Sequence, residues 1–387
     1  MTSSKPQFVG KKVRLGDIVK IEKASMPSGN NVWVLNLDAV EKGTGKVIVK
    51  NRMKADSAGA STVAFTADAV LYSKLRPNLN KVVVADEPGL ATSEMLPLIV
   101  NPEVLDRRYF AYLLRSNSFV NLAVSSTAGS KMPRMNKKTL LNAVFPIPSL
   151  ELQHQRIDLL SSIEKARTKA ELLIQQLDAL VKSRFVEMFG DPSDANGNKA
   201  KVKVASICEL RIGPFGSALH KNDYISGGHP LINPSHIIGS SIIPDADLTV
   251  SDDKYKSLEA YHLLPGDIVL GRRGEIGRCA VVQDKGFLCG TGSMVLRPRA
   301  GVRSEYLQRV VSFPSFRQAL ERNAVGVTMK NLNAKIVGAA DMYLPSINQQ
   351  DDFISFTKQV DKSRFGGMLR LLNSFSGIMH ASFFFCN

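Results

Sequence analysis

The sequence predicts an α+β protein made of two similar bodies, each followed by a long helix, with the two helices paired as an antiparallel coiled coil. Three observations predict this fold: a 40-residue stretch without Gly or Pro, a repeat at a fixed spacing of 197 residues, and an uneven distribution of charge. A fixed internal period indicates copies of one structural unit, so we expect a pseudo-two-fold repeat within the chain. The boundaries are a first body at 1–148, a central spacer helix at 149–190, a second body at 191–345 and a C-terminal spacer helix at 346–387.

The stretch without Gly or Pro runs from Leu150 to Phe189 and is predicted to be one helix. At 1.5 Å per residue it would be roughly 60 Å long, far above the usual length of about a dozen residues. Its apolar residues recur at alternating steps of four and three, which is typical of a coiled-coil seam. The predicted pairing residues are Leu159, Ile163, Ala166, Ala170, Leu173, Leu177 and Leu180, with Met368, Leu372 and Phe375 on the second helix. Gly366 and Gly367 interrupt the seam of the second helix. For the stretch from Leu150 to Phe189, the alternative is a long helix packed inside a single domain.

The repeat relates residues 12–148 to residues 199–345. The segment LPGDIVLGRRGEIGRCAVV (264–282) corresponds to FTADAVLYSKLRPNLNKVVV (65–84). At a constant offset of 197, the matched pairs are Tyr109 and Tyr306, Phe119 and Phe316, Gly129 and Gly326, Met132 and Met329, Asn136 and Asn333, Pro148 and Pro345, and Gln153 and Gln350. Similar order, similar spacing and an ungapped match over some forty residues indicate duplication rather than chance.

The net charge of +15 is carried by the two bodies and not by the central helix. Residues 1–150 hold 21 Lys and Arg against 11 Asp and Glu, and residues 190–346 hold 19 against 15. The central helix, 151–189, holds six of each sign. This division predicts a polyanionic partner for the bodies and a protein partner, or mutual packing, for the helices. A basic surface without a specific partner is the alternative.

The motifs of several enzyme classes are absent. The chain lacks a G-x-x-x-x-G-K-[ST] loop for nucleotide phosphates, and Asn233-Pro234-Ser235-His236 lacks the second Pro and the aromatic residue of a DNA methyltransferase motif. A nuclease-like spacing of Pro244-Asp245 with Asp252 and Lys254 is short enough to arise by chance. Four Cys without C-x-x-C spacing and six scattered His do not form a zinc framework. We therefore predict no catalytic and no metal-binding residues.

No apolar leader and no run of twenty apolar residues occur, so we expect a cytoplasmic protein without membrane contact.

Basic loops at equivalent places in the two bodies are the predicted DNA-binding residues. Arg pairs with guanine, Asn with adenine and Lys with phosphate, so such mixtures suit a DNA groove. In the first body they are Lys74, Arg76, Asn78, Lys131, Arg134, Asn136, Lys137 and Lys138. In the second body they are Arg272, Arg273, Arg278, Lys330, Asn331, Asn333 and Lys335. For any one of these residues the alternative is a partner in a surface salt bridge.

Four segments carry a resemblance to a known family. They are NKKTLLNAVFPIPSLELQHQRI (136–157), ELLIQQLDALVKSRFVEMFGDP (171–192), IGPFGSALHKNDYISGGHPLI (212–232) and KNLNAKIVGAADMYLPSINQQ (330–350). With them and the duplicated plan, the chain resembles the specificity (S) subunits of type I restriction–modification enzymes over nearly its whole length.

The resemblance implies that each body is a target recognition domain reading one half of a split site in double-stranded DNA. The helices would then set the gap between the halves and dock two methyltransferase (M) subunits. Cleavage would belong to separate restriction (R) subunits. No cofactor is expected in this chain; S-adenosylmethionine, ATP and Mg would reside on the partner subunits. The alternatives are a non-catalytic protein-interaction scaffold with a basic surface, and an enzyme of unrecognised type.

Overall fold

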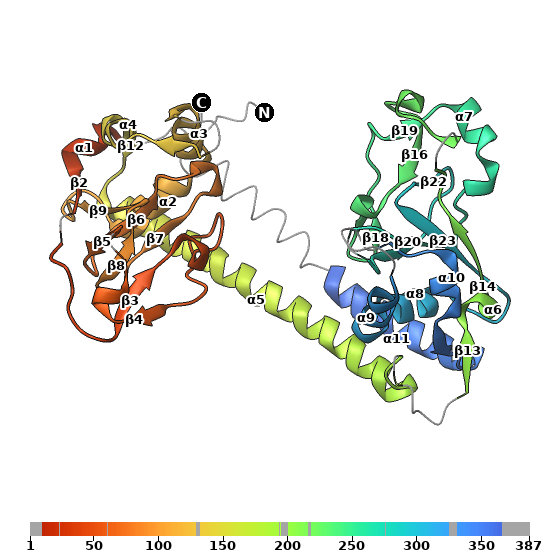
Figure 1. Cartoon of the computed structure of the whole chain (residues 1–387). Helices are drawn as coiled ribbons and strands as arrows, with labels where there is room; N and C mark the ends of the chain where they lie inside the picture. Colours follow the sequence, from red (N-terminus) through yellow and green to blue (C-terminus); the bar gives the residue numbers. More distant parts are fainter. Residues whose placement is uncertain are drawn as a thin grey trace, which may run out of the picture. The chain divides into compact units, whose positions relative to one another are not determined.

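The computed structural model divides the chain into two compact units, and the division falls between Leu173 and Ile174, inside a helix (Figure 1). That helix, α5 (Leu150–Phe189), is the 40-residue helix that the sequence predicts. Unit 1 comprises the described residues before the division and unit 2 those after it. The described residues are 10–22, 24–59, 61–128, 132–192, 194, 200–215, 218–274, 276–324 and 331–365.

Unit 1 is built on two four-stranded sheets. The first is antiparallel, in the order β2 (Val19–Ile21), β9 (Met95–Val100), β6 (Val70–Ser73), β7 (Val82–Val84). The second has the order β4 (Asn51–Met53), β3 (Val32–Leu35), β8 (Gly89–Thr92), β5 (Thr62–Phe65), with β3 and β8 parallel. Two further pairs are β1 (Lys11–Arg14) with β12 (Val144–Ile147), and β10 (Thr127–Ala128) with β11 (Arg134–Met135).

The helices of unit 1 cover the first sheet with their apolar faces. They are α1 (Leu15–Ile18), α2 (Arg107–Arg115), α3 (Asn117–Ser125) and α4 (Lys137–Asn142), with 3-10 turns at Leu37–Ala39, Ala55–Ser57 and Pro77–Leu79. α2 begins where the Asp106 carboxylate accepts hydrogen bonds from the backbone N–H groups of Arg108 and Tyr109. Such a cap satisfies amides that have no partner within the helix. Tyr109 and Phe119 are fully buried in the core between these helices and the sheet.

Unit 2 repeats this plan. Its first sheet is again antiparallel, in the order β14 (Cys208–Ile212), β23 (Ser293–Pro298), β20 (Ile268–Gly271), β21 (Cys279–Val281). The second has the order β15 (Tyr224–Ile225), β19 (Thr249–Val250), β16 (His229–Ile232), β22 (Leu288–Cys289), with β16 and β22 parallel. Smaller pairs are β13 (Lys201–Lys203) with β24 (Asp341–Tyr343), and β17 (Ile237–Ile238) with β18 (Ser241–Ile242).

The helices of unit 2 occupy the corresponding places in the chain. They are α6 (Val204–Ile207), α7 (Asp252–Ser257), α8 (Ser304–Ser312), α9 (Pro314–Asn323), α10 (Ala334–Ala339) and α11 (Ile347–Phe365), with 3-10 turns at Lys221–Asp223, Pro234–His236 and Glu259–Tyr261. Tyr306 and Phe316 are buried in the core at the positions that Tyr109 and Phe119 hold in unit 1. The predicted α+β internal repeat is thus confirmed.

One buried glutamine joins each unit to the helix that follows it. The side chain of Gln153 donates to the carbonyl oxygens of Val104 (2.8 Å) and Pro148 (2.9 Å) and accepts from the Asp106 amide (2.8 Å). In unit 2 the side chain of Gln350 makes three equivalent bonds, each 197 residues further along: to Gly301 O (3.0 Å), to Pro345 O (2.9 Å) and from Arg303 N (2.8 Å). Both side chains are 0% exposed. The hydrogen bonds of Gln153 and Gln350 hold the start of each helix against its own unit.

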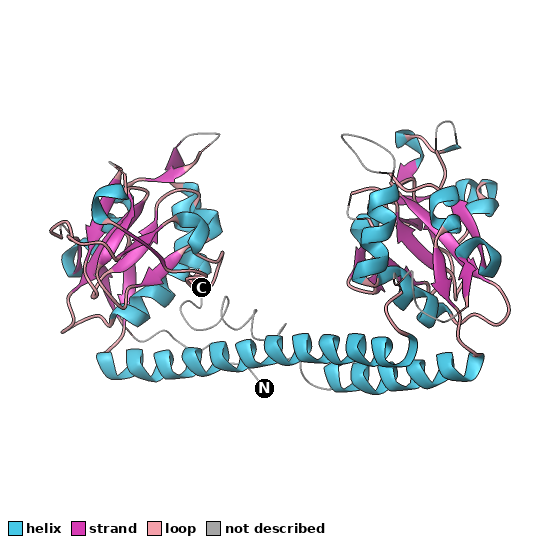
Figure 2. Ribbon diagram, turned by 60° about the horizontal axis from the view of Figure 1, so that its bottom comes forward, coloured by secondary structure: helices cyan, strands magenta, loops and turns pink. Residues whose placement is uncertain are grey.

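Within unit 2, α11 packs antiparallel against the end of α5 (Figure 2). Phe185 on α5 contacts Phe353 near the start of α11, with ring centroids 5.4 Å apart. Arg364, near the end of α11, forms an ion pair with Asp178, which lies earlier on α5. The predicted pairing residues Met368, Leu372 and Phe375 lie outside the described residues.

The residues of the predicted seam on α5 differ in burial, and the pairing itself stays a prediction because its partner residues lie outside the described part of the chain. Leu159, Leu173 and Leu180 are 44%, 39% and 48% exposed, and Ala166 is also exposed. Ile163 is buried, Leu177 packs against the unit 2 core, and Ala170 is half-buried. The other buried apolar positions are Ile157 and Leu160 in unit 1, and Val181, Phe185 and Phe189 in unit 2. The buried residues of α5 lie near its two ends, where they pack against the core of unit 1 or the core of unit 2.

Candidate nucleic-acid interface

In unit 1 the two predicted basic loops lie side by side, although about 60 residues separate them in sequence. The Arg76 amide donates to Pro133 O (2.8 Å), and the Met135 amide donates to Lys74 O (2.9 Å). Arg76 adopts a left-handed backbone (φ 49°), which turns the chain at the end of β6 into the Pro77–Leu79 turn. These bonds join Lys74, Arg76 and Asn78 on one loop to Arg134 and its neighbours on the other.

The Glu94 carboxylate, which the sequence did not indicate as part of the site, lies between the two loops. Both oxygens of Glu94 accept from Arg134 Nε (3.1 Å each), and one also accepts from Arg134 Nη2 (3.0 Å). Lys74 Nζ lies 3.9 Å from the other oxygen of Glu94. The hydrogen bond to Glu94 raises the pKa of Arg134 above its ordinary value. Glu94 is 40 residues from Arg134 in sequence, so no local pattern indicates the contact.

The remaining predicted residues of unit 1 divide into exposed and structural groups. Arg76, Asn78, Lys137 and Lys138 are exposed to solvent. Asn136 is exposed, but its side-chain oxygen accepts from the Lys138 amide and caps α4. The last of the set, Lys131, lies outside the described residues.

Unit 2 joins its two loops differently, through a buried arginine. Arg272 is 8% exposed; its Nε donates to Leu332 O (3.0 Å), and its own carbonyl accepts from the Leu332 amide (3.0 Å). Burial, and next the neighbouring Arg273, lowers the pKa of Arg272. The guanidinium of Arg272 is buried and bound to the backbone, so little of it is accessible to a DNA groove, and the DNA contact of Arg272 stays a prediction. Arg272 holds one loop against the other.

Other predicted residues surround this junction. Arg273 and Lys335 are exposed, and Arg278 is half-buried with interactions of its own. Asn333 caps α10 by accepting from the Ile336 amide (2.9 Å), as Asn136 caps α4 in unit 1. The side-chain oxygen of Asn331 is buried without a hydrogen-bond partner. Lys330 lies outside the described residues.

Lys335 also lines a hollow of about 660 Å³ between α9, α10 and β13. Lys201 and Arg322 line it as well, so three cations from three elements border one concavity. Lys201 and Arg322 were not among the predicted DNA-binding residues, because they lie outside the predicted loops in sequence and only the fold brings them beside Lys335.

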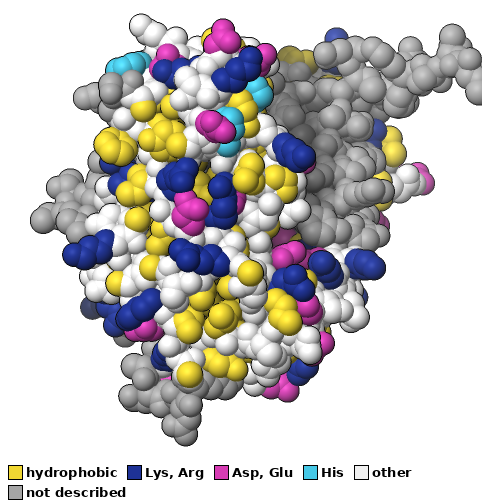
Figure 3. Space-filling view, turned by 90° about the vertical axis from the view of Figure 1, so that its right-hand side faces the viewer, with side chains coloured by type: hydrophobic (Ala, Val, Ile, Leu, Met, Phe, Trp, Pro, Cys, Tyr) yellow, Lys and Arg dark blue, Asp and Glu magenta, His cyan; other side chains and the backbone are white. Residues whose placement is uncertain are grey.

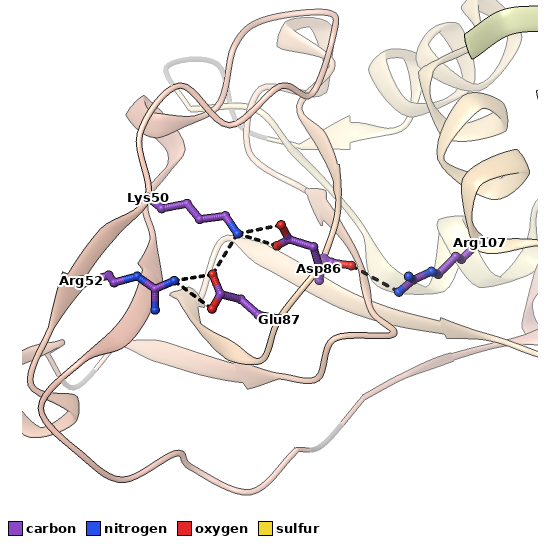
Figure 4. Close-up of polar contacts among 6 residues, drawn as sticks. Lys50, Arg52, Asp86, Glu87 and Arg107 are labelled. Carbon is purple, nitrogen blue, oxygen red and sulfur yellow. Dashed lines mark hydrogen bonds and ion pairs between the residues drawn. The ribbon is translucent and has the colours of Figure 1, made fainter.

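Part of the positive charge of unit 1 is neutralised away from these loops. Lys50 bridges Asp86 (2.7 Å) and Glu87 (2.8 Å), and Arg52 binds the same Glu87 (2.7 Å), as Figure 4 shows. Lys50 Nζ also lies 4.6 Å from the centroid of the Trp33 ring. The hydrogen bonds from Lys50 and then Arg52 lower the pKa of Glu87. These two cations are therefore occupied within unit 1.

The surface of unit 2 carries mixed charge. Figure 3 shows one face of it, where Lys and Arg side chains are spread among apolar and acidic ones. Among the described residues no group of three or more His, Cys, Asp or Glu side chains could hold a metal ion. Over the same residues, no helix combines the length and the apolar character that crossing a membrane requires.

Two comparisons with known proteins show similarity to the same kind of subunit. The chain is 27% identical over 142 residues to the type I restriction enzyme EcoDI specificity subunit of Escherichia coli, a match that covers 37% of this chain and 31% of that protein. This chain therefore matches less than a third of that relative's length. It is 19% identical over 293 residues to the MjaVIII specificity subunit of Methanocaldococcus jannaschii, covering 70% of this chain and 68% of that protein.

Solved structures share the fold. The type I restriction–modification system S subunit from M. genitalium aligns with a TM-score of 0.56 at 14% identity, covering 95% of this chain and 93% of that one. A chain from a structural study of complex assembly in the type I R-M system aligns with a TM-score of 0.56 at 15% identity, over 99% of this chain and 100% of that one.

The family described as "Type I restriction modification DNA specificity domain" matches residues 10–177 and 196–366, one match for each copy of the repeat. The two matches cover most of the chain and contain both loop junctions. The chain belongs to the type I restriction modification DNA specificity domain family, and it carries two such domains.

Proposed function

We propose that this chain is the DNA sequence-recognition subunit of a type I restriction–modification complex. Each unit would bind one half of a split target in double-stranded DNA. The observation that carries the proposal is the junction of two polar, cationic loops, which occurs at the same place in both specificity domains. A duplicated reader suits a site with two halves, because one chain then supplies one reading surface for each half.

The chain would contribute recognition and no chemistry of its own. The matches to specificity subunits support a non-catalytic role. We further propose two methyltransferase (M) subunits docked on the helices, with restriction (R) subunits joining the complex. S-adenosylmethionine, ATP and Mg would be bound by those partners, and the complex would act in the cytoplasm.

The exposed cations Arg76, Lys137 and Lys138 in unit 1, with Arg273 and Lys335 in unit 2, would supply phosphate contacts. Affinity should therefore fall steeply with salt, and base contacts should add the sequence preference. Specific binding by such proteins exceeds non-specific binding by roughly a thousandfold or more.

The test is fluorescence anisotropy of labelled duplexes with the full chain and its methyltransferase partner. Methylated bases in the source genome, read by long-read sequencing, supply the candidate split site. We expect that duplex to compete far better than the same duplex with either half scrambled. Equal competition by all duplexes would reject DNA recognition and favour the interaction scaffold.

A further inference from the structure

The contact between Glu94 and Arg134 in unit 1 leaves one edge of the guanidinium available. The Glu94 carboxylate accepts hydrogen bonds from Nε–H and from one N–H of Nη2 of Arg134, which is a bidentate contact. Nη1 donates a weaker bond to Met132 O (3.3 Å). An arginine has five N–H donors, so two remain, one on each terminal nitrogen. Among the described residues no further acceptor contacts that outer edge.

An arginine held in this way differs from a freely moving surface cation. Its long side chain has already lost most of its rotamer freedom, so binding costs less entropy than for a free arginine. Two parallel N–H groups match the O6 and N7 acceptors of guanine, which is the commonest specific contact of arginine with DNA. Arg134 is 44% exposed while Glu94 is 22% exposed, so the arginine is the more accessible of the two.

We propose that Arg134 reads a guanine in the half-site bound by unit 1, and that Glu94 is the positioning residue that holds its guanidinium for this contact. The inference rests on the proposed function, and it adds the base that one domain reads and the residue that sets the preference. The negative charge of Glu94 also weakens the attraction of the loop for any phosphate, which disfavours non-specific binding.

Unit 2 cannot make the same arrangement. In the two sheets Ser73 pairs with Met95, and Gly271 pairs with Ser293, so Gly292 occupies the position of Glu94. A Cβ at Gly292 would lie 2.9 Å from Pro234 Cδ, so a side chain does not fit there without a shift. At the offset of 197, Asn331 stands where unit 1 has Arg134. The half-site bound by unit 2 is therefore an internal control in every measurement.

The experiment measures base preference with the full chain and its methyltransferase partner. Single base-pair changes are made across both halves of the wild-type site, and competition is followed by anisotropy. The variants are Glu94→Gln, which removes the negative charge, and Arg134→Lys, which keeps the positive charge but removes the paired N–H donors of the guanidinium. The matched control is Lys137→Gln, an exposed cation near the same junction.

We expect both variants to lose discrimination at one and the same G·C pair, by roughly five- to 150-fold, the range for a bidentate contact. Preferences in the other half-site should stay within about twofold of wild type, which also shows that each variant is folded. Lys137→Gln should weaken binding to all duplexes equally.

Three results overturn the inference. They are an unchanged preference in Glu94→Gln, effects of the two variants at different base pairs, and an equal loss of affinity for every duplex. If the wild type discriminates between split sites, any of these three results rejects only the proposed role of Glu94 and Arg134, and the proposed function stands. If the wild type shows no sequence preference, the proposed function fails, and this inference fails with it.

Discussion

Replacing Gln350 by alanine should lower the free energy needed to open the start of α11 from unit 2 by about 3 kcal/mol. The side chain is fully buried and makes three hydrogen bonds, to two backbone carbonyls and from one backbone amide. Each buried bond contributes about 1 kcal/mol net, and leaving its partners unpaired adds to the loss. At 1.36 kcal/mol per factor of ten, local opening should become roughly 150-fold more frequent.

Hydrogen–deuterium exchange with mass spectrometry measures this opening directly. Peptides that contain the Arg303 amide and the first turn of α11 should exchange faster in Gln350→Ala. The exposed Gln359→Ala on the same helix is the matched control and should change little. Gln153→Ala should have the same effect on unit 1 and the start of α5, because its three bonds are equivalent. An increase in exchange rate of less than about fivefold in both Gln350→Ala and Gln153→Ala would refute this reasoning.

Four further results are expected. Lys131→Glu combined with Arg134→Glu should abolish DNA binding in anisotropy while assembly with the methyltransferase partner persists, and normal binding would remove these loops from the interface. Insertion of seven residues within 165–172 lengthens α5 by about 10 Å, so methylation mapping should show a gap longer by about three base pairs; an unchanged gap would contradict a spacer role. Arg272→Met should destabilise unit 2 by about 2 kcal/mol in urea unfolding without changing the salt dependence of DNA binding; a changed salt dependence would instead indicate phosphate contact. Burial raises the pKa of Cys279 from 9.0 to about 12. The folded chain keeps a proton that the unfolded chain loses, so this stability is present below about pH 9 and declines toward pH 12. Urea midpoints at pH 8 and 10.5 should therefore fall less in Cys279→Ala than in wild type, and equal falls would exclude this thiol as a cause.

The repeat could be found in the sequence because its markers are residues that the fold cannot easily replace. Tyr109 and Tyr306 fill the two cores, while Gln153 and Gln350 hold the two helices. The continuous helix α5 was equally evident, since 40 residues without Gly or Pro favour helix along the whole stretch. These features depend on composition and spacing within one segment.

The geometry of the candidate interface could be predicted only in part, because several contacts join segments far apart in the chain. Arg272 and Arg273 are neighbours of the same type, yet the fold buries the first against Leu332 and leaves the second exposed. Glu94 approaches Arg134 only because the turn before β9 lies beside the second loop. A sequence pattern does not report such contacts.

The sequence by itself determined that the chain holds two copies of one α+β unit, that a long helix connects them, and that the two copies carry matching polar loops. Only the tertiary structure decided which stripe of α5 is buried, which cations are already paired, and which arginine faces solvent. The physical reason is that propensity and periodicity act between residues close in sequence. Burial and ion pairing depend on partners that folding brings together from distant segments, as it does for Glu94 and Arg134.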